Sequence, residues 1–417
     1  MSFGDCADDA GLRTAWKQFC QRLEAAGDAV FKDANPALPL HRADGFRFLA
    51  QNLGQAFDLA LETKNTKYPV IHAFCTPFCK LGGDNADYTY QQAWIDGESA
   101  YRISGNRGTS RFFNIAVQGA RVMTNPGNPR FRPLNEPFGD VPEVNLFGHD
   151  MEIGWDGSFE VYIGGPKRGP NWLPTTPQSR KLFIRNGFDE WSEVPAQIRI
   201  ERLGMSEPRP TPTPAEMVTA IDWAGQFLFD MMRDNPEWQY EFSEDIDPGK
   251  VNQFPTEGRK LGDTVHTSAS DRRRGRSIYA MCWRLAADEA MIIEWDRNDL
   301  FWMMTNMGVF LNSMDYLYRP ISYTPSRTKA DGDGKIRMVM AHGDPGFHNW
   351  IDTSGLEQGM LVNRNQGTDR ATTFRTQVVK HADLAGHMPA HSPRSSPEER
   401  TEQMQQRFQG ILRRYLF

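Results

Sequence analysis

The chain has 417 residues, of which 39% are apolar and 12% aromatic, so it can bury a core and is long enough for two or three domains. Its net charge is −6 at pH 7 and its pI is about 5.9. Binding to nucleic acid or to an anionic membrane depends on clustered positive charge, and this balance argues against both. The one dense basic run, at residues 272–276, has no interleaved aromatic side chains and is typical of a solvated loop.

No apolar stretch reaches the length of about 18 residues that a membrane-spanning helix needs. The first residues, MSFGDCADDAGLR, are acidic and lack the apolar segment of a secretory signal. The five cysteines are odd in number and lack the spacing of a disulfide framework, which indicates reduced thiols. We therefore expect a cytoplasmic protein that binds neither a membrane nor nucleic acid.

The N-terminal region is predicted to be helical. Apolar side chains such as Trp16, Phe19 and Leu23 recur every three or four residues over residues 9–29. A second stripe of this kind runs over residues 42–62. Both stripes predict helices that pack on a core.

From residue 68 onward, short apolar or alternating segments are separated by Gly, Asn, Asp and Pro, which is typical of β-strands joined by turns. The loop at residues 125–145 contains five prolines and is predicted to be irregular. The predicted strands of this region are 88–95, 100–104, 112–117, 159–163, 181–185 and 197–202.

A proline-rich connector at residues 206–214 ends this region. Thr213, Pro214 and Glu216 then supply an N-cap, a proline at the first helical position and a capping-box carboxylate. They predict a helix that reaches about residue 233.

The remaining predicted elements are both strands and helices. Strand-like segments return at residues 289–295, 301–305 and 309–311. Helices are predicted at residues 277–287 and, after the capping sequence Ser-Pro-Glu-Glu that begins at residue 396, at the C-terminus. We expect this last helix to dock on the body of the protein.

The segment at residues 334–364 repeats, in altered form, the one at residues 157–185. Each runs from a glycine through an extended apolar stretch and a Gly/Pro loop to an Asn-Trp pair, and then through a second apolar stretch to an arginine. Outside this part, residues 100–119 align more weakly with residues 290–308. The repeat predicts an internal duplication, and the order of helices and strands predicts the α+β class.

We therefore predict two antiparallel, jelly-roll-like β-sandwich units, each accompanied by helices. The helices lie at the two ends of the chain and between the sandwich units. The predicted domains are N-terminal helices (1–67), a first sandwich unit (68–205), a proline-rich linker with a helical segment (206–287), a second sandwich unit (288–390) and a C-terminal helix (391–417).

Several motifs resemble a bacterial family known as domain of unknown function 1214. The most specific is Asp344-Pro-Gly followed by Asn349-Trp-Ile-Asp-Thr. The resemblance implies β-sandwich modules, and it implies hydrolase-like roles less specifically. It covers most of residues 81–364 through further motifs, which are LGGDNADY from Leu81, YRISGNRGT from Tyr101, MDY from Met314 and DGDG from Asp331.

Differences between the two copies of the repeat indicate where chemistry lies. When Trp172 is aligned with Trp350, three prolines of the first copy stand where the second copy has Asp344, His348 and Asp352. Proline only shapes a loop, whereas Asp and His can exchange protons or bind metals. These three residues are our candidate catalytic groups, with the histidine titrating near neutral pH and a carboxylate fixing its tautomer.

Two alternatives stay open for the same loop. His342, Asp344 and His348 could supply three ligands to an open metal site, so the cofactor is unknown or is a divalent metal ion. Asp-Pro-Gly is also a good turn sequence, and the side chain of Asp352 could cap a second turn. The turn interpretation needs no chemistry.

Residues that could contact a substrate have structural alternatives too. The Asn-Trp pair occurs in both copies, so its asparagine is expected to bond loop backbone beside a buried tryptophan. The turn around Arg107 could offer an anion site or simply join two strands, and Trp302 could line an apolar cavity or pack in the core. The candidates for substrate contact are Tyr88, Arg107, Trp302, Trp350 and Arg364.

The leading hypothesis is an enzyme, a hydrolase or lyase, that acts on a small, largely apolar organic substrate with acid/base or metal chemistry in the second unit. The substrate class rests on the 11 Trp, 26 Phe and 18 Met residues. The sequence has no Gly-x-Ser-x-Gly or Walker motif, which argues against a serine-hydrolase elbow and nucleotide hydrolysis. The alternative is a non-catalytic β-sandwich protein for ligand binding or assembly. Under both hypotheses the protein could be a homo-oligomer.

Overall fold

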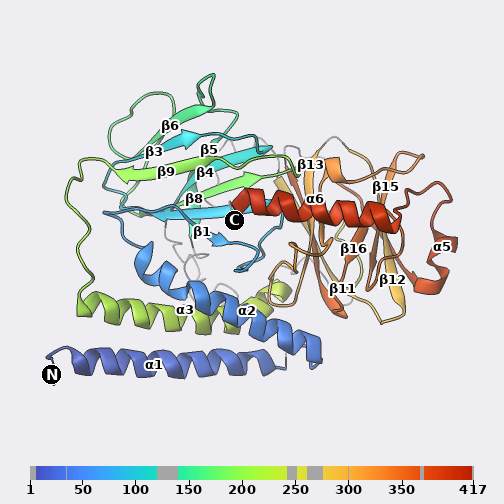
Figure 1. The fold of residues 1–417 in the computed structure, drawn as a ribbon, viewed down its shortest axis with the longest axis horizontal. Coiled ribbons are helices and arrows are strands. Elements are labelled where there is room, and N and C mark those ends of the chain that lie inside the picture. The colour runs from blue at the N-terminus through green and yellow to red at the C-terminus, as the bar shows by residue number, and fades with distance from the viewer. Residues whose placement is uncertain are drawn as a thin grey trace.

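The structure is a computed structural model that describes residues 6–33, 35–119, 140–241, 251–260, 276–298, 300–366 and 371–415. Within these residues it contains four β-sheets and five α-helices, which confirms the α+β class. Three helices lie below the first pair of sheets in Figure 1, and the C-terminal helix runs from the second pair towards the first. The α-helices are α1 (Asp9–Asp28), α2 (Pro39–Phe57), α3 (Pro214–Glu241), α5 (Leu384–His387) and α6 (Pro397–Tyr415).

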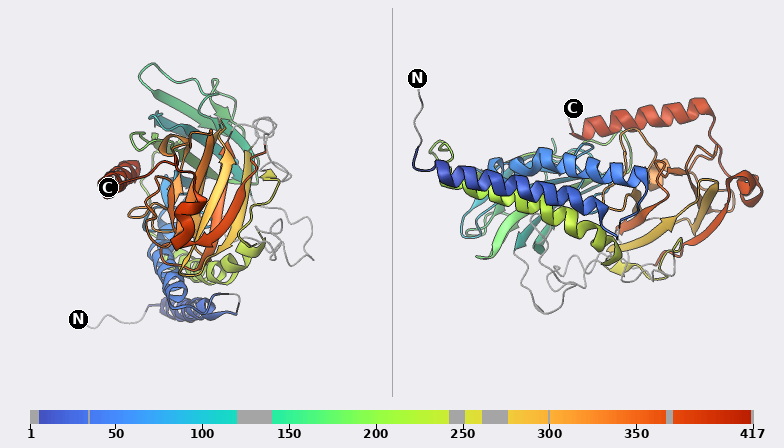
Figure 2. Two further views of the ribbon diagram at one scale, coloured as in Figure 1. Left: turned by 90° about the vertical axis from the view of Figure 1, so that its right-hand side faces the viewer. Right: turned by 90° about the horizontal axis from the view of Figure 1, so that it is seen from below.

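The helices α1, α2 and α3 form one layer, and Figure 2 shows them side by side when the molecule is seen from below. α1 packs along α3 and buries Ala15, Phe19 and Ala26, so of the predicted apolar stripe Phe19 is buried, whereas Trp16 is exposed. α2 continues as a short π-helical turn at Asp58–Glu62. No helix among the described residues combines the length and the apolar character needed to cross a bilayer.

The first half of the chain forms two sheets that share a core. Alternate residues face that core, such as Ile103 and Val161 from one sheet and Ile115 and Ile184 from the other. In hydrogen-bonded order, one sheet is β1 (His72–Cys75), β2 (Tyr88–Trp94), β8 (Ser179–Gly187), β4 (Phe112–Gly119) and β5 (Val141–Phe147). The other is β7 (Trp172–Leu173), β6 (Ser158–Ile163), β3 (Tyr101–Asn106) and β9 (Gln197–Arg202).

The second half also forms two sheets around a core, here rich in Trp and Met. Trp283 and Trp302 from one sheet meet Trp295 and Met338 from the other. One sheet is β10 (Arg259–Lys260), β11 (Arg276–Arg284), β17 (Gln358–Gln366), β13 (Phe301–Met307) and β14 (Ser322–Tyr323). The other is β16 (Trp350–Asp352), β15 (Lys335–Ala341), β12 (Glu289–Asp296) and β18 (Arg375–Lys380).

The two halves have closely similar strand orders. The series β2-β8-β4 in the first half stands where β11-β17-β13 stands in the second, and β7-β6-β3-β9 where β16-β15-β12-β18 stands. In both four-stranded sheets the short strand that begins with tryptophan pairs in parallel, Trp172 opposite Tyr162 and Trp350 opposite Val339. All other strand pairings between named strands of the described residues are antiparallel.

Three local predictions are wrong. Residues 277–287 were predicted as a helix, but β11 occupies most of them because both of its faces are buried and its apolar run carries no clear period. Residues 309–311 form a turn in which Leu311 has a φ of 55°, which no strand residue adopts. Most of the loop predicted at residues 125–145, the part up to residue 139, lies outside the described residues. Its last part belongs to strand β5 and is therefore regular.

The predicted helix caps are confirmed. The Ser396 hydroxyl accepts the backbone N–H of Glu399 at 3.2 Å, and the Glu399 carboxylate accepts the backbone N–H of Ser396 at 2.9 Å. Thr213 and Glu216 form the same reciprocal pair at the start of α3, at 3.3 and 2.7 Å. Local sequence therefore sets where both helices begin.

Candidate functional site

Three arginines lie on one face of α6. Arg400, Arg407 and Arg414 are spaced by seven residues, close to two helical turns, and all three are buried. Arg400 donates from Nε to the Asp344 carboxylate at 2.9 Å and from Nη1 to the His348 carbonyl at 3.1 Å. The first arginine therefore fixes the loop that contains the candidate catalytic residues.

The other two arginines connect α6 to both halves of the chain. Arg407 donates to the Ser322 carbonyl at 2.7 Å and to the Ser322 hydroxyl at 3.1 Å. Arg414 donates to the Asp87 carboxylate at 3.1 Å and to the Ala86 carbonyl at 3.2 Å. α6 therefore bridges the second pair of sheets and the loop before β2.

Trp191, from the loop between β8 and β9, lies among arginines. The guanidinium carbons of Arg327, Arg407 and Arg414 lie 3.9, 4.9 and 4.7 Å from its ring centre. Arg327 belongs to the short turn Pro325–Arg327, and its Nη2 lies 2.6 Å from a carboxylate oxygen of Asp87.

This cluster contains more positive than negative charge. Three guanidinium groups surround Trp191, and two of them, those of Arg327 and Arg414, contact the carboxylate of Asp87 directly. Burial, together with the charge of the neighbouring Arg327, lowers the pKa of Arg407 to about 9. Burial would raise the pKa of Asp87, but Arg327 and Arg414 outweigh it and lower that pKa. Nη1 of Arg327 is buried and has no hydrogen-bond partner among the described residues.

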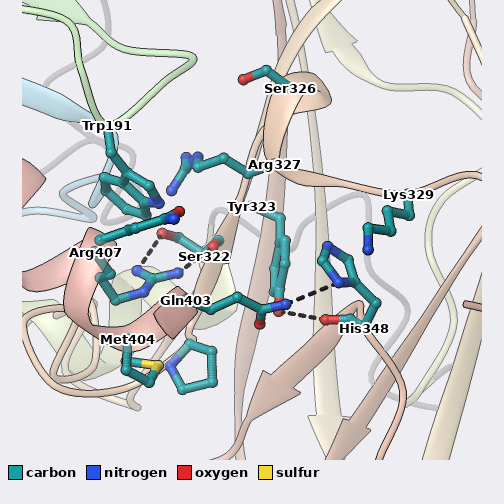
Figure 3. A pocket seen from close by; sticks show the side chains of 12 residues that line it. Trp191, Ser322, Tyr323, Ser326, Arg327, Lys329, His348, Gln403, Met404 and Arg407 are labelled. Atoms are coloured by element: carbon teal, nitrogen blue, oxygen red, sulfur yellow. Dashed lines mark hydrogen bonds between the residues drawn. The ribbon is translucent and has the colours of Figure 1, made fainter. Parts of the chain in front are cut away.

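A pocket of about 240 Å³ opens beside this cluster (Figure 3). Arg327 points towards Trp191 at one end, and His348 lies beyond Tyr323 at the other. The cations at its wall are Arg327, Lys329 and Arg407, and within the described part of the chain no carboxylate lines it. The full lining is Trp191, Pro320, Ser322, Tyr323, Ser326, Arg327, Lys329, His348, Gln403, Met404, Gln406 and Arg407.

A second pocket, of about 470 Å³, adjoins the first. The two pockets share Trp191, Ser326, Arg327 and Gln406, so one molecule could reach into both. Of the residues that the structure describes, none with an aliphatic side chain lines the second pocket. Its remaining walls are Glu190, Ser192, Gln409, Gly410 and Arg413.

His348 is the one predicted site residue that lines the first pocket. Its Nδ1 lies 2.8 Å from the Gln403 amide nitrogen, which donates to it (Figure 3). Burial lowers the pKa of His348 to about 4, and the charges of Lys329 and Arg400 act in the same direction. The imidazole is therefore neutral at neutral pH.

The two predicted catalytic carboxylates lie elsewhere and serve the local structure. Asp344 pairs with Arg400 and accepts the N–H of Gly346 at 2.9 Å. Asp352 is buried, pairs with Arg319 at 2.8 Å and accepts the N–H of Ser354 at 2.7 Å. Both N–H contacts are the two-residue turns that the alternative interpretation describes.

The predicted metal ligands do not converge. The Nδ1 of His342 contacts the Thr353 hydroxyl at 2.8 Å and its Nε2 the Ala286 carbonyl at 3.1 Å, whereas Asp344 and His348 face α6. Among the described residues, the group that brings three ligand atoms within 4.8 Å of one another is Asp331, Asp333 and His391. Arg337 pairs with both of those carboxylates and offsets part of their charge.

The five predicted substrate contacts lie outside both pockets. Trp302 is 1% exposed and packs at 5.4 Å from Trp295, so it is a core residue and not a cavity wall. Tyr88 is buried and its hydroxyl accepts from Gln366. The other three bond to backbone: Arg107 to the Ser110 carbonyl at 2.9 Å, Trp350 to the Ala341 carbonyl at 3.2 Å and Arg364 to the Gly83 carbonyl at 2.6 Å.

The structural role predicted for the Asn-Trp pair is confirmed in both halves. Asn171 donates to the carbonyls of Glu152 and Glu160 at 2.8 and 3.0 Å, and its amide oxygen accepts the N–H of Glu152. Asn349 donates to the carbonyls of Lys329 and Arg337 at 2.7 and 2.9 Å, and accepts the N–H of Lys329.

The two tryptophans also make equivalent hydrogen bonds, and these bonds change the alignment of the two repeated segments. Trp172 donates to the Gly164 carbonyl at 3.2 Å and Trp350 to the Ala341 carbonyl at the same distance. Gly164 therefore corresponds to Ala341 and not to His342. The second copy has one extra residue before Trp350, so the alignment of a proline with Asp344 is not fixed by the strands.

Sequence reasoning missed the residues that build the pocket. Arg407, Trp191, Arg327 and Asp87 come from four separate segments, so no local motif connects them. One signal was available: arginines at every seventh position of an amphipathic C-terminal helix, on the same face as Ile411.

No family model matches the chain, and no curated protein matches it in sequence. The structure is similar to the crystal structure of an uncharacterised protein from Burkholderia cenocepacia, with a TM-score of 0.76 and 27% sequence identity over 90% of this chain and 99% of that one. A second solved structure, the VPA0106 protein from Vibrio parahaemolyticus, gives a TM-score of 0.43 and 12% identity over 86% of this chain and all of the other.

Proposed function

We propose that this protein binds a small anionic molecule, a carboxylate or a phosphate ester, in the pocket between α6 and the second pair of sheets. The observation that carries the proposal is the excess of buried positive charge at the pocket wall. The largely buried Arg327 and Arg407 line the pocket, the exposed Lys329 adds a third cation, and no carboxylate of the described residues lines it.

The physical reason is the free energy of uncompensated charge. An ionised group removed from water loses several kcal/mol of solvation, which only a partner of opposite charge restores. Asp87 offsets part of this by pairing directly with two guanidinium groups, those of Arg327 and Arg414. A bound anion would offset more, and guanidinium groups recognise carboxylate and phosphate oxygens well.

Binding is better supported than the expected hydrolysis or elimination of a largely apolar substrate. Those reactions were assigned to Asp344, His348 and Asp352, and each of the two carboxylates pairs with a different arginine. Catalysis remains the second candidate because His348, neutral at pH 7, lines the pocket. Turnover of a bound ester by the wild type, abolished by His348→Gln, would favour it.

We further propose that the two halves are β-sandwich units from an internal duplication. The similar strand orders and the shared Asn-Trp hydrogen bonds support this origin. Membership of the domain of unknown function 1214 family rests on the motifs between residues 81 and 364. Cytoplasmic location and homo-oligomerisation stay predictions.

Titration calorimetry with inorganic phosphate and with citrate tests the binding proposal. Lys329 is exposed at the pocket wall, so Lys329→Ala should leave the fold intact while removing one cation. A charge-assisted contact contributes about 1.5–3 kcal/mol, so the dissociation constant should rise by about ten- to a hundredfold. Lys380→Ala, which removes an exposed lysine paired with Asp288, is the control. Absence of anion binding by the wild type, or equal affinity in the Lys329 variant, would overturn the proposal.

A further inference from the structure

We infer that the natural ligand is a phosphorylated polyol of the sugar-phosphate class, with its phosphate in the first pocket and its hydroxyl-bearing body in the second. This inference rests on the proposed anion binding and adds the identity of the remainder of the ligand. The two pockets adjoin, because Trp191, Ser326, Arg327 and Gln406 line both.

The phosphate is assigned to the first pocket because three cations and no carboxylate line it among the described residues, whereas the second pocket has Arg327 and Arg413 beside the carboxylate of Glu190. Arg327, Lys329 and Arg407 line that pocket together with the neutral His348. A phosphate monoester has three terminal oxygens and a charge near −2, which suits several separate donors better than one carboxylate does. In the second pocket Glu190 adds a negative charge, which disfavours a second anionic group at that end.

The chemistry of the second pocket selects the body of the ligand. Among the described residues, its wall offers two hydroxyls, two primary amides, a carboxylate, two guanidinium groups and the Trp191 indole, and no aliphatic side chain. Such side chains donate and accept hydrogen bonds, as the hydroxyls of a polyol also do. An apolar body would leave these groups without partners and would lose affinity for that reason. The polar side chains concerned are Glu190, Ser192, Ser326, Arg327, Gln406, Gln409 and Arg413.

Both ends of the site depend on α6. Arg407 and Gln403 face the first pocket, and Gln409 and Arg413 face the second from the next helical turns. The buried arginine Arg414 fixes the end of this helix on Asp87. The helix therefore sets the distance between the phosphate and the hydroxyls that the site can accept.

Calorimetry with three probes tests the inference: inorganic phosphate, glucose 6-phosphate and phenyl phosphate. We expect glucose 6-phosphate to bind about tenfold more tightly than phosphate, the gain of one or two hydrogen bonds at about 1 kcal/mol each. Phenyl phosphate should bind no more tightly than phosphate. Gln409→Ala should lower the ratio of glucose 6-phosphate to phosphate affinity towards one, and Gln405→Ala, on an exposed position of α6 outside both pockets, should not.

The outcomes separate this inference from the proposed function. If neither phosphate nor either ester binds, the anion-binding proposal itself fails. If phosphate binds and both esters bind equally well, only the polyol assignment fails. Tighter binding of phenyl phosphate than of glucose 6-phosphate would also overturn the polyol assignment, because the body would then be apolar.

Discussion

Gly410 of α6 and Trp191 of the β8–β9 loop approach so closely that a Cβ atom at position 410 would lie 2.8 Å from the Cβ of Trp191. Carbon atoms do not come this close without strain, so glycine is required for α6 to pack on the tryptophan. The contact places Trp191 among the arginines and forms the wall that the two pockets share.

Gly410→Ala should therefore destabilise the protein. Alanine in a helix is favoured over glycine by up to about 1 kcal/mol, but overpacking costs about 1–3 kcal/mol, and here the obstacle includes backbone. We expect a net loss of about 1 kcal/mol in the free energy of unfolding, measured by urea denaturation. Gly54→Ala in α2 is the matched control: nothing lies within 4 Å of its added Cβ, so it should stabilise. A Gly410 variant as stable as the Gly54 variant would show that α6 does not pack as described.

Asn349→Ala and Asn171→Ala should destabilise by similar amounts, because the two asparagines make the same set of three backbone hydrogen bonds. Losing these bonds and leaving backbone groups unpaired should cost about 2–4 kcal/mol in each variant.

Asn349→Asp gives an internal comparison for this prediction. It keeps an acceptor for the Lys329 N–H but has no donor for the two carbonyls, so it should be no more stable than the alanine variant. Chemical denaturation of the three variants checks the prediction. A loss below about 0.5 kcal/mol for either alanine variant would contradict the structural role.

Local signals in the sequence predicted most of the helices and strands. α1 and α6 follow from apolar spacing and from the Ser396 capping box, which act within a few residues. β11 was predicted wrongly because its two faces contact two different apolar clusters, so Tyr279 and Ala280 are both buried. Burial on both faces is a property of the sheet, and no local period reports it.

The pocket could not be predicted in the same way. His348 was selected because it differs from the first copy of the repeat, and it does line the pocket. The acids selected by the same comparison, Asp344 and Asp352, form turns. Arg327 and Asp87 are separated in the sequence by about half of the chain, and only the packing of the two halves brings them together.

Asp87→Asn should destabilise the protein strongly. The carboxylate is fully buried and pairs with Arg327 at 2.6 Å and with Arg414 at 3.1 Å. Removing one partner of a buried ion pair leaves uncompensated charge and costs about 3–5 kcal/mol.

Asp288→Asn is the control for this variant, because Asp288 pairs with Lys380 at the surface and such a pair contributes about 0–1 kcal/mol. Thermal and urea unfolding of both variants measure the difference. If Asp87→Asn loses no more stability than the control variant, the arginines must find another anionic partner in the protein. The argument for a missing counter-charge would then fail.

His348 should make the protein sensitive to mild acid. Its pKa is about 4 in the folded state and near its ordinary value of 6.5 when unfolded, so the unfolded chain binds more protons between these pH values. The stability that the neutral imidazole contributes is present above pH 6.5 and is lost as the pH falls towards 4. His348→Gln keeps a polar side chain without the titration, so its melting temperature should fall less than that of the wild type between pH 7 and pH 4.5. The charged groups near this histidine, Lys329, Arg400 and Glu399, are unchanged in the variant, and other carboxylates titrate equally in both proteins. Parallel melting curves for the two proteins over this range would therefore mean that His348 is solvated and does not lie at the buried end of the pocket.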